Sequence, residues 1–81
     1  MALLLNKPQA KAVADAMTAL NNVGARAHIR LREAGRRLHV QEYLDGEVYV
    51  FFGDMAGNCT DAHTLERYRS QNDFFAAYGV A

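Results

Sequence analysis

The sequence predicts an α+β fold in two layers: an N-terminal helix, a three-stranded antiparallel meander, and a C-terminal helix or helix pair. Apolar residues recur at helical spacing before residue 24, alternate with polar residues over residues 25–52, and return to helical spacing near the C-terminus. The 81 residues suffice for a single domain, residues 1–81, near the lower size at which a hydrophobic core alone stabilises a fold.

Cap signals delimit the first helix. Asn6 is a good N-cap, Pro8 lies in the first turn, and Gln9 occupies the third helical position, as in a capping box. Gly24 is a natural stop. Residues 2–5 are apolar and leave a second interpretation open, a short edge strand that leads into the helix. The apolar stripe of the helix comprises Ala10, Val13, Ala14, Met17 and Leu20.

The alternation over residues 25–52 is typical of half-buried strands. Ala34-Gly35 interrupts the first run, and Asp45-Gly46 is the strongest turn signal in the chain. A two-residue loop at the first turn and a three-residue loop, residues 44–46, at the second gather apolar residues on one face. The register then pairs Ile29 with Val40, Leu31 with Leu38, Val40 with Val50 and Leu38 with Phe52. This apolar face collects Ala27, Ile29, Leu31, Leu38, Val40, Val48, Val50 and Phe52, with Glu42 as its one misfit near the rim.

The stretch after the third strand begins with a loop, Gly-Asp-Met-Ala-Gly-Asn. Asn58 or Thr60 can then cap a helix that begins near Asp61 and turns Leu65 and Tyr68 inward.

A second cap signature, Ser70 with Asp73, precedes an apolar run that Gly79 ends. Two short helices or one kinked helix fit this pattern. A break is favoured, because a straight helix would place Asn72 on the apolar stripe.

The other face of the sheet is the candidate functional surface, because helices on the opposite side leave it open. Arginine and aromatic side chains, which protein interfaces enrich, alternate along its strands. An ordinary sheet surface stays open as the alternative, because tyrosine and phenylalanine have high strand propensity. The candidate partner-binding residues are Arg26, His28, Arg30, Arg32, Arg37, His39, Tyr43, Tyr49 and Phe51.

Charge is balanced overall and uneven locally. Nine basic and nine acidic side chains cancel, which argues against a strongly basic nucleic-acid binder and against an acidic DNA mimic. Residues 24–39 nevertheless carry +4 and residues 40–81 carry −5. Arg32 and Arg37 oppose each other in the register above, an unfavourable pair unless a partner anion relieves it.

No catalytic or metal-binding constellation is visible. Cys59 and His63 lie four residues apart, but His28 and His39 belong to the other side of the sheet, so no metal site and no cofactor are expected. Cys59 lacks a histidine–acid pair that could activate it. A single cysteine, a short apolar start and no membrane-length run favour a cytoplasmic protein without a membrane partner.

The order helix–three strands–helix resembles the double-stranded-RNA-binding domain across nearly the whole chain. That family reads RNA with a basic run at the start of its last helix. The matching stretch here, Asn58-Cys-Thr-Asp-Ala-His63, has no lysine, so RNA binding by that mode is not expected. The size and layout are also similar to small phage-encoded anti-CRISPR inhibitors, which implies a protein that occludes a macromolecular surface.

The leading hypothesis is therefore a non-enzymatic binding protein, an inhibitor of host defence, that presents its sheet face to a protein or a protein–nucleic-acid complex. Tyr49 and Phe51 would be the apolar anchors, and Arg30 and Arg37 the charged ones. The acidic segment, residues 54–66, offers a second surface for a basic partner. The alternative is direct nucleic-acid binding through the same arginine and aromatic residues. A homodimer is also compatible with the sequence.

Overall fold

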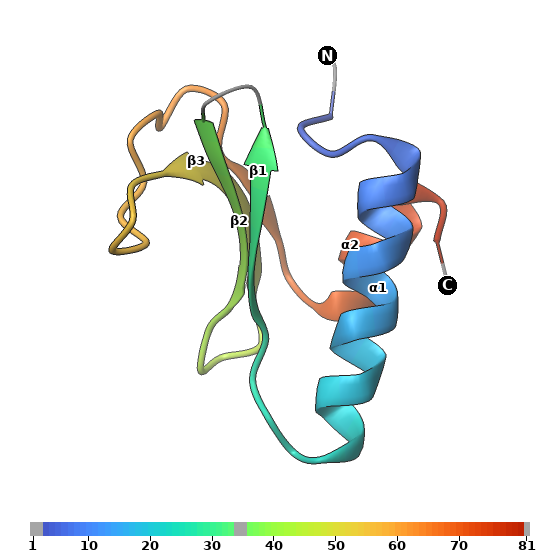
Figure 1. Cartoon of the computed structure of the whole chain (residues 1–81). Coiled ribbons are helices and arrows are strands. Elements are labelled where there is room, and N and C mark those ends of the chain that lie inside the picture. Colours follow the sequence, from blue (N-terminus) through green and yellow to red (C-terminus); the bar gives the residue numbers. More distant parts are fainter. Residues whose placement is uncertain (1–2, 34–35, 81) are drawn as a thin grey trace.

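The computed structural model, which describes residues 3–33 and 36–80, has the two-layer α+β architecture, with four strands in its sheet. Both helices lie on one side of the sheet, and the loop that follows the third strand lies on the other (Figure 1). The elements are α1 (Lys7–Asn22), β1 (His28–Glu33), β2 (Arg36–Glu42), β3 (Val48–Gly53), β4 (Glu66–Tyr68) and α2 (Gln71–Tyr78).

The predicted capping box of α1 is confirmed. The Asn6 side chain accepts a hydrogen bond from the Gln9 backbone N–H at 2.9 Å, and the Gln9 side chain accepts one from the Asn6 N–H at 2.9 Å. Gly24 follows the helix with φ of +70°, a backbone conformation that glycine adopts without strain. Residues 3–5 form no strand, so the edge-strand interpretation of the N-terminus is wrong for the part that is described.

The predicted register of the meander is confirmed. Ile29 lies opposite Val40 and Leu31 opposite Leu38, and on the other side of β2 Val40 lies opposite Val50. The second turn is the expected three-residue loop, closed by a 2.8 Å hydrogen bond from Tyr43 N–H to Glu47 O, with Gly46 at φ +89°. The loop predicted at Ala34-Gly35 lies outside the described residues.

The helix predicted to begin near Asp61 is wrong, and β4 takes its place. β4 pairs antiparallel with β3, so the sheet has the order β1-β2-β3-β4. Leu65 and Tyr68 lie three apart, which suggested a helix. However, Tyr68 and Glu66 lie opposite Val48 and Val50, while Arg67 lies opposite Tyr49. This alternation is the period of a strand, and it gives β3 a second hydrogen-bonded neighbour.

The second cap signature is confirmed. The Ser70 hydroxyl accepts a hydrogen bond from the Asp73 N–H at 3.1 Å, and α2 ends at Gly79 with φ of +67°.

The core lies between the helices and the inner face of the sheet. Glu42, the polar misfit of that face, sits at the rim as expected and accepts hydrogen bonds from Ala27 N–H and the Gln71 amide at 3.2 and 3.1 Å. Among the described residues, no helix has the length and apolar character needed to cross a membrane. The largest fully buried side chains of this core are Phe74, Met17, Leu38, Val13, Val40, Val48 and Val50.

Candidate partner-binding face

The outer face of the sheet, which points away from the helices, carries the rows that the sequence predicts. Arg30 lies opposite His39, and His39 lies opposite Phe51. The next row brings His28, Gln41 and Tyr49 side by side, and Arg32 lies opposite Arg37. The predicted side-chain neighbours are thus confirmed, and the outer face holds all nine candidate residues.

The outer face is not uniformly open, which corrects the expectation for two candidates. Phe51 is only 2% exposed and His39 is 0% exposed. Their rings stack on each other with centroids 5.2 Å apart. Phe51 therefore cannot act as an exposed anchor in this structure, and His39 cannot contact a partner directly.

A loop folds back over this part of the sheet. We call residues 54–58 the covering loop. It is a tight turn built around Asp54, whose carboxylate accepts hydrogen bonds from the backbone N–H groups of Ala56 and Asn58 at 3.0 and 2.9 Å. These hydrogen bonds, that from Asn58 above all, hold the pKa of Asp54 below its ordinary value. Gly57 completes the turn with φ of +89°.

Two histidines fasten the covering loop to the sheet. His39 Nε2 lies 3.0 Å from the Asp54 carbonyl oxygen, and His28 Nε2 lies 3.1 Å from His39 Nδ1. A carbonyl oxygen only accepts, so His39 donates from Nε2, and its Nδ1 in the neutral ring accepts from His28. Both ring nitrogens of buried His39 therefore have hydrogen-bond partners.

Gly53 permits this close approach. A Cβ at this position would lie 2.7 Å from His39 Cδ2 and 2.8 Å from the Asn58 carbonyl oxygen. Any side chain there would push the histidine and the loop apart. The glycine at position 53 is thus the sequence feature that indicates the covering loop. It can be recognised only when the register of the strands is known, because the register brings Gly53 close to His39.

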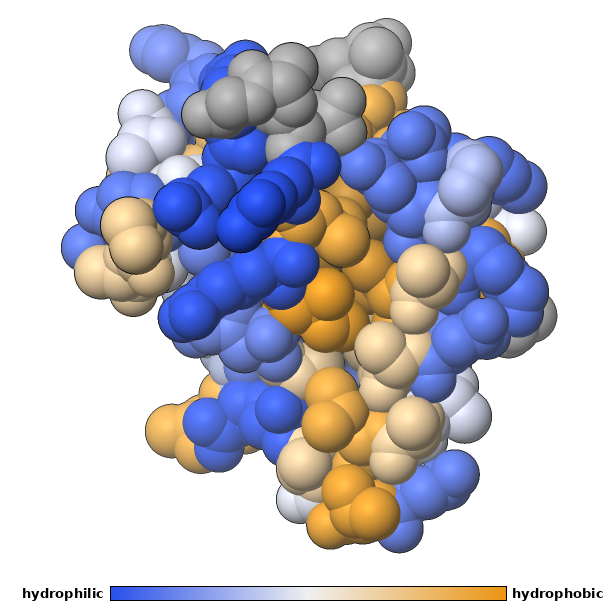
Figure 2. Space-filling model, in the orientation of Figure 1, coloured by the Kyte–Doolittle hydropathy of each residue, from blue (hydrophilic) through white to orange (hydrophobic). Residues whose placement is uncertain are grey.

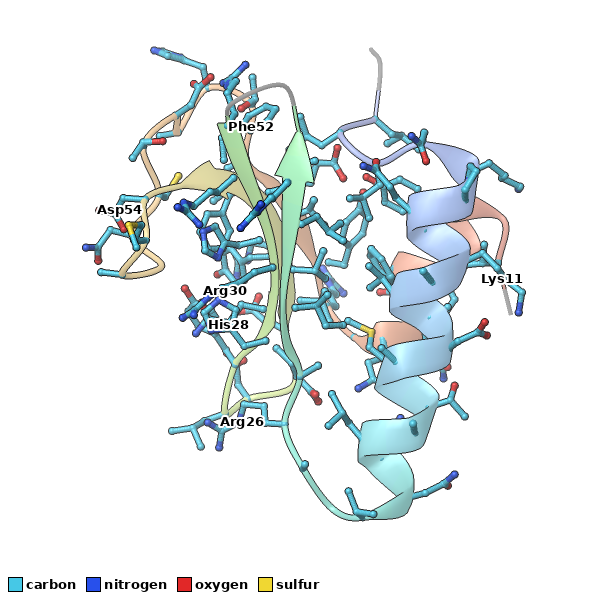
Figure 3. All side chains as sticks on the ribbon, viewed as in Figure 1. Lys11, Arg26, His28, Arg30, Phe52 and Asp54 are labelled. Carbon is cyan, nitrogen blue, oxygen red and sulfur yellow. The ribbon has the colours of Figure 1, made fainter. Side chains whose placement is uncertain are left out.

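The exposed basic side chains of the outer face lie along β1 and just before it. Side chains on one face of a strand repeat about every 6.6 Å. Figure 3 shows three of these side chains on the side of the sheet away from α1, with Asp54 on the loop beyond them. We call this exposed set the basic row; it comprises Arg26, His28, Arg30 and Arg32.

The arginines of the basic row have no acidic partner among the side chains that the structure describes, those of residues 3–32 and 36–80. The ion pairs within these residues are Lys11–Asp15, Arg36–Asp61 and Arg67–Glu47. Partial burial, followed by the neighbouring Arg30 charge, lowers the pKa of His28 below its ordinary value. At neutral pH the positive charge of the row therefore comes from its arginines.

The acidic segment, residues 54–66, differs from the basic row because its charged side chains have partners within the fold. Its carboxylates serve the fold: Asp54 in the covering loop, Asp61 in an ion pair with Arg36, and Glu66 in β4 as a hydrogen-bond acceptor. Glu66 accepts hydrogen bonds from Leu4 N–H at 2.7 Å, from the Tyr68 hydroxyl at 2.7 Å and from the Tyr78 hydroxyl at 2.6 Å. The sequence placed a second docking surface here, and it missed this structural use of the same charges.

The tyrosines of the outer face contact each other. Tyr43 and Tyr49 stack with ring centroids 4.6 Å apart. Tyr43 is 42% exposed, and Tyr49 is half-buried with its hydroxyl 3.4 Å from the Glu47 carboxylate. Of the two predicted anchors, only Tyr49 retains accessible surface.

The remaining chemistry-bearing side chains do not converge. Cys59 is exposed, and no group of three or more His, Cys, Asp or Glu side chains within the described part of the chain is placed to hold a metal ion. A groove of about 440 Å³ lies along β4, lined by Leu3, Leu4 and residues 63–68. The segment that corresponds to the RNA-reading helix start of the double-stranded-RNA-binding domain forms turns here, not a helix.

Comparison of the chain with protein-family models, with curated proteins and with solved structures gave no match.

Proposed function

We propose that this protein is a non-enzymatic binding protein that engages an acidic macromolecular partner through the basic row. The observation that supports this most strongly is the unequal use of charge. The carboxylates of Asp54, Asp61 and Glu66 are engaged within the fold. The arginines of the basic row lack an acidic partner in the described part of the chain, although arginine is suited to bidentate contact with carboxylates and phosphates.

A protein partner is favoured over a nucleic acid. Nucleic-acid binding by an open sheet relies on aromatic rings on which bases stack. Phe51 is buried, and Tyr43 and Tyr49 stack on each other. The basic row also borders half-buried Ile29 and Leu31, and apolar surface of this kind matches a polypeptide better than a phosphate backbone. Direct nucleic-acid binding through the basic row is the second candidate function.

The test is a quantitative pull-down from host lysate with nuclease and without it. Three proteins are compared: the natural chain, Arg30→Glu, and Arg69→Glu, which makes the same charge change at an exposed arginine outside the basic row. We expect a protein that the natural chain and Arg69→Glu capture equally, that Arg30→Glu loses, and that nuclease leaves in place.

Two results would contradict the proposal. Equal capture of the same proteins by Arg30→Glu would remove the basic row from the interaction. Capture that disappears with nuclease would establish the nucleic-acid function instead, and its affinity should fall with salt by a log–log slope of roughly −0.9 per neutralised phosphate. The inhibitor role, the lack of catalysis and the cytoplasmic location stay predictions.

A further inference from the structure

We infer that the free edge of β1 accepts an extended segment of a partner protein as a further strand of the sheet, and that this segment alternates acidic with apolar residues. The inference rests on the proposed function and names its partner and its binding mode. It follows from the backbone groups at this edge, from the side chains on its two sides, and from the exclusion of a second copy of the chain.

The backbone of β1 is paired on one side only. Within residues 3–33 and 36–80, β1 bonds to β2 and to no other strand. Glu42 N–H donates to Ala27 O at 2.8 Å, which fixes the phase of the ladder. Because alternate residues of an antiparallel ladder face the partner strand, His28, Arg30 and Arg32 direct their N–H and C=O groups to the free edge. These three residues offer six backbone hydrogen-bonding groups to an added strand.

The edge lacks most of the features by which proteins protect an exposed strand. β1 has six residues and contains neither proline nor lysine. Its pairing with β2 runs without interruption from His28 to Glu33, so no bulge turns the edge away. Its basic side chains are the one protection that remains, and they act only against partners of like charge.

The two sides of the edge call for different side chains. Figure 2 shows a strongly hydrophilic strip beside an apolar patch at the centre of the view, where β1 lies in front in the same orientation. The hydrophilic side carries the basic row, and the apolar side carries half-buried Ile29 and Leu31. An added strand has side chains that alternate between the same two faces. Acidic residues would thus lie beside the arginines, and apolar residues beside Ile29 and Leu31.

A second copy of this chain does not fit the same edge. Two β1 strands that pair antiparallel around a twofold axis place the edge-facing residues opposite one another. Centred on Arg30, this sets Arg30 against itself and His28 against Arg32. Centred on Leu31, it sets Arg30 against Arg32, and centred on Ile29, it sets Arg26 against Arg32. Like charges directly opposite each other destabilise a strand pair. The feature that excludes self-association therefore selects an acidic strand.

The test selects nine-residue peptides from a random library on the immobilised full chain and on the charge-reversed variant Arg30→Glu/Arg32→Glu, after thermal unfolding has shown that both are folded. We expect the natural chain to enrich peptides in which acidic and apolar residues alternate. We expect the variant to enrich peptides with the same two-residue period, but with lysine or arginine in place of the acidic residues. Arg69→Glu, the matched control, should select the same peptides as the natural chain.

The most enriched peptide is then measured by fluorescence anisotropy in two N-methylated forms that keep every side chain. Methylation of the amides that face β1 should weaken binding at least tenfold, and methylation of the alternate amides should leave it unchanged. Equal loss with both forms, or enrichment of acidic peptides without a two-residue period, would overturn strand addition while the basic row still stands as an acid-binding surface. Selection of the same peptides by Arg30→Glu/Arg32→Glu, or the absence of any enriched peptide, would overturn strand addition together with the proposed function.

Discussion

The two edges of the sheet differ in almost every respect that decides whether an edge can take a partner. β4 has three residues, and its side chains are engaged: Arg67 Nε donates to the Glu47 carboxylate at 2.7 Å, and Glu66 accepts three hydrogen bonds from Leu4, Tyr68 and Tyr78. β1 is twice as long, and its arginines have no acidic partner in the described chain.

Charge composition alone therefore says little about which surface of a neutral protein is available. Both edges carry ionisable residues, but those beside β4 hold the N-terminal segment, the sheet and α2 together. The covering loop bonds to His39 of β2, which stacks on buried Phe51 of β3. We call the β4 edge, with its engaged side chains, the closed edge; at the β1 edge the arginines have no acidic partner among the described side chains.

The largest expected effect comes from opening the closed edge with Glu66→Ala. The Tyr78 and Tyr68 hydroxyls and the Leu4 N–H would lose their shared acceptor, and a buried polar group without a partner costs about 1–3 kcal/mol. We expect a loss of about 2–3 kcal/mol in the free energy of unfolding, measured by urea denaturation. Glu66→Gln keeps an acceptor oxygen and should lose less. A change below 0.5 kcal/mol in Glu66→Ala would show that the closed edge does not depend on this carboxylate.

The covering loop is tested with Gly53→Ala, which should cost about 1–3 kcal/mol, as overpacking does. The added methyl group meets His39 and the Asn58 carbonyl at less than 3.0 Å. Gly46→Ala is the control. Its positive φ also makes an alanine unfavourable there, but no atom lies within 4 Å of the added Cβ, so nothing near the two histidines is disturbed. Imidazole nitrogen chemical shifts should change for His28 and His39 in Gly53→Ala alone. Unchanged shifts there would mean that the loop does not pack on His39.

Alkaline pH should weaken the closed edge. Burial, with the hydrogen bond to Glu66 in second place, raises the pKa of both Tyr68 and Tyr78 far above the ordinary value. The unfolded chain therefore releases these protons near pH 10 while the folded chain keeps them, so stability falls as the pH rises above about 10, by at most about 1.4 kcal/mol per pH unit for each tyrosine. Urea midpoints between pH 9 and 11 measure the slope. Tyr78→Phe should flatten it and exposed Tyr43→Phe should not; equal slopes in all three proteins would refute the linkage.

The smallest expected effect compares one arginine from each edge. Arg67→Ala removes the ion pair with Glu47 and should lower the free energy of unfolding slightly, as the loss of an exposed pair does. Arg30→Ala removes a charge without an acidic partner in the described chain, so its free energy of unfolding should stay within about 0.5 kcal/mol of the natural chain. Chemical denaturation of both variants at low salt measures the difference. A larger loss in Arg30→Ala would mean that the basic row serves the fold.

Local patterns predicted the parts of the fold that neighbours in sequence decide. Asn6 with Gln9 and Ser70 with Asp73 mark both helix starts, because a cap is formed within one turn. The two-residue period of β1–β3 and the turn at Gly46 determine the register, since a slip by one residue would turn every apolar side chain outward. The same register placed all nine candidate residues on one face.

Contacts between distant parts of the chain determine which parts of that face stay exposed. Glu66-Arg67-Tyr68 is too short to show a period, and it becomes a strand because β3 has unpaired backbone groups beside it. The covering loop lies on the sheet because Gly53 allows the approach and His39 satisfies the Asp54 carbonyl. Contacts between residues that are distant along the chain leave no local pattern. The elements, their register and their faces thus follow from local patterns, whereas long-range packing engages the side chains of β4 and leaves the arginines of β1 without an acidic partner among the described side chains.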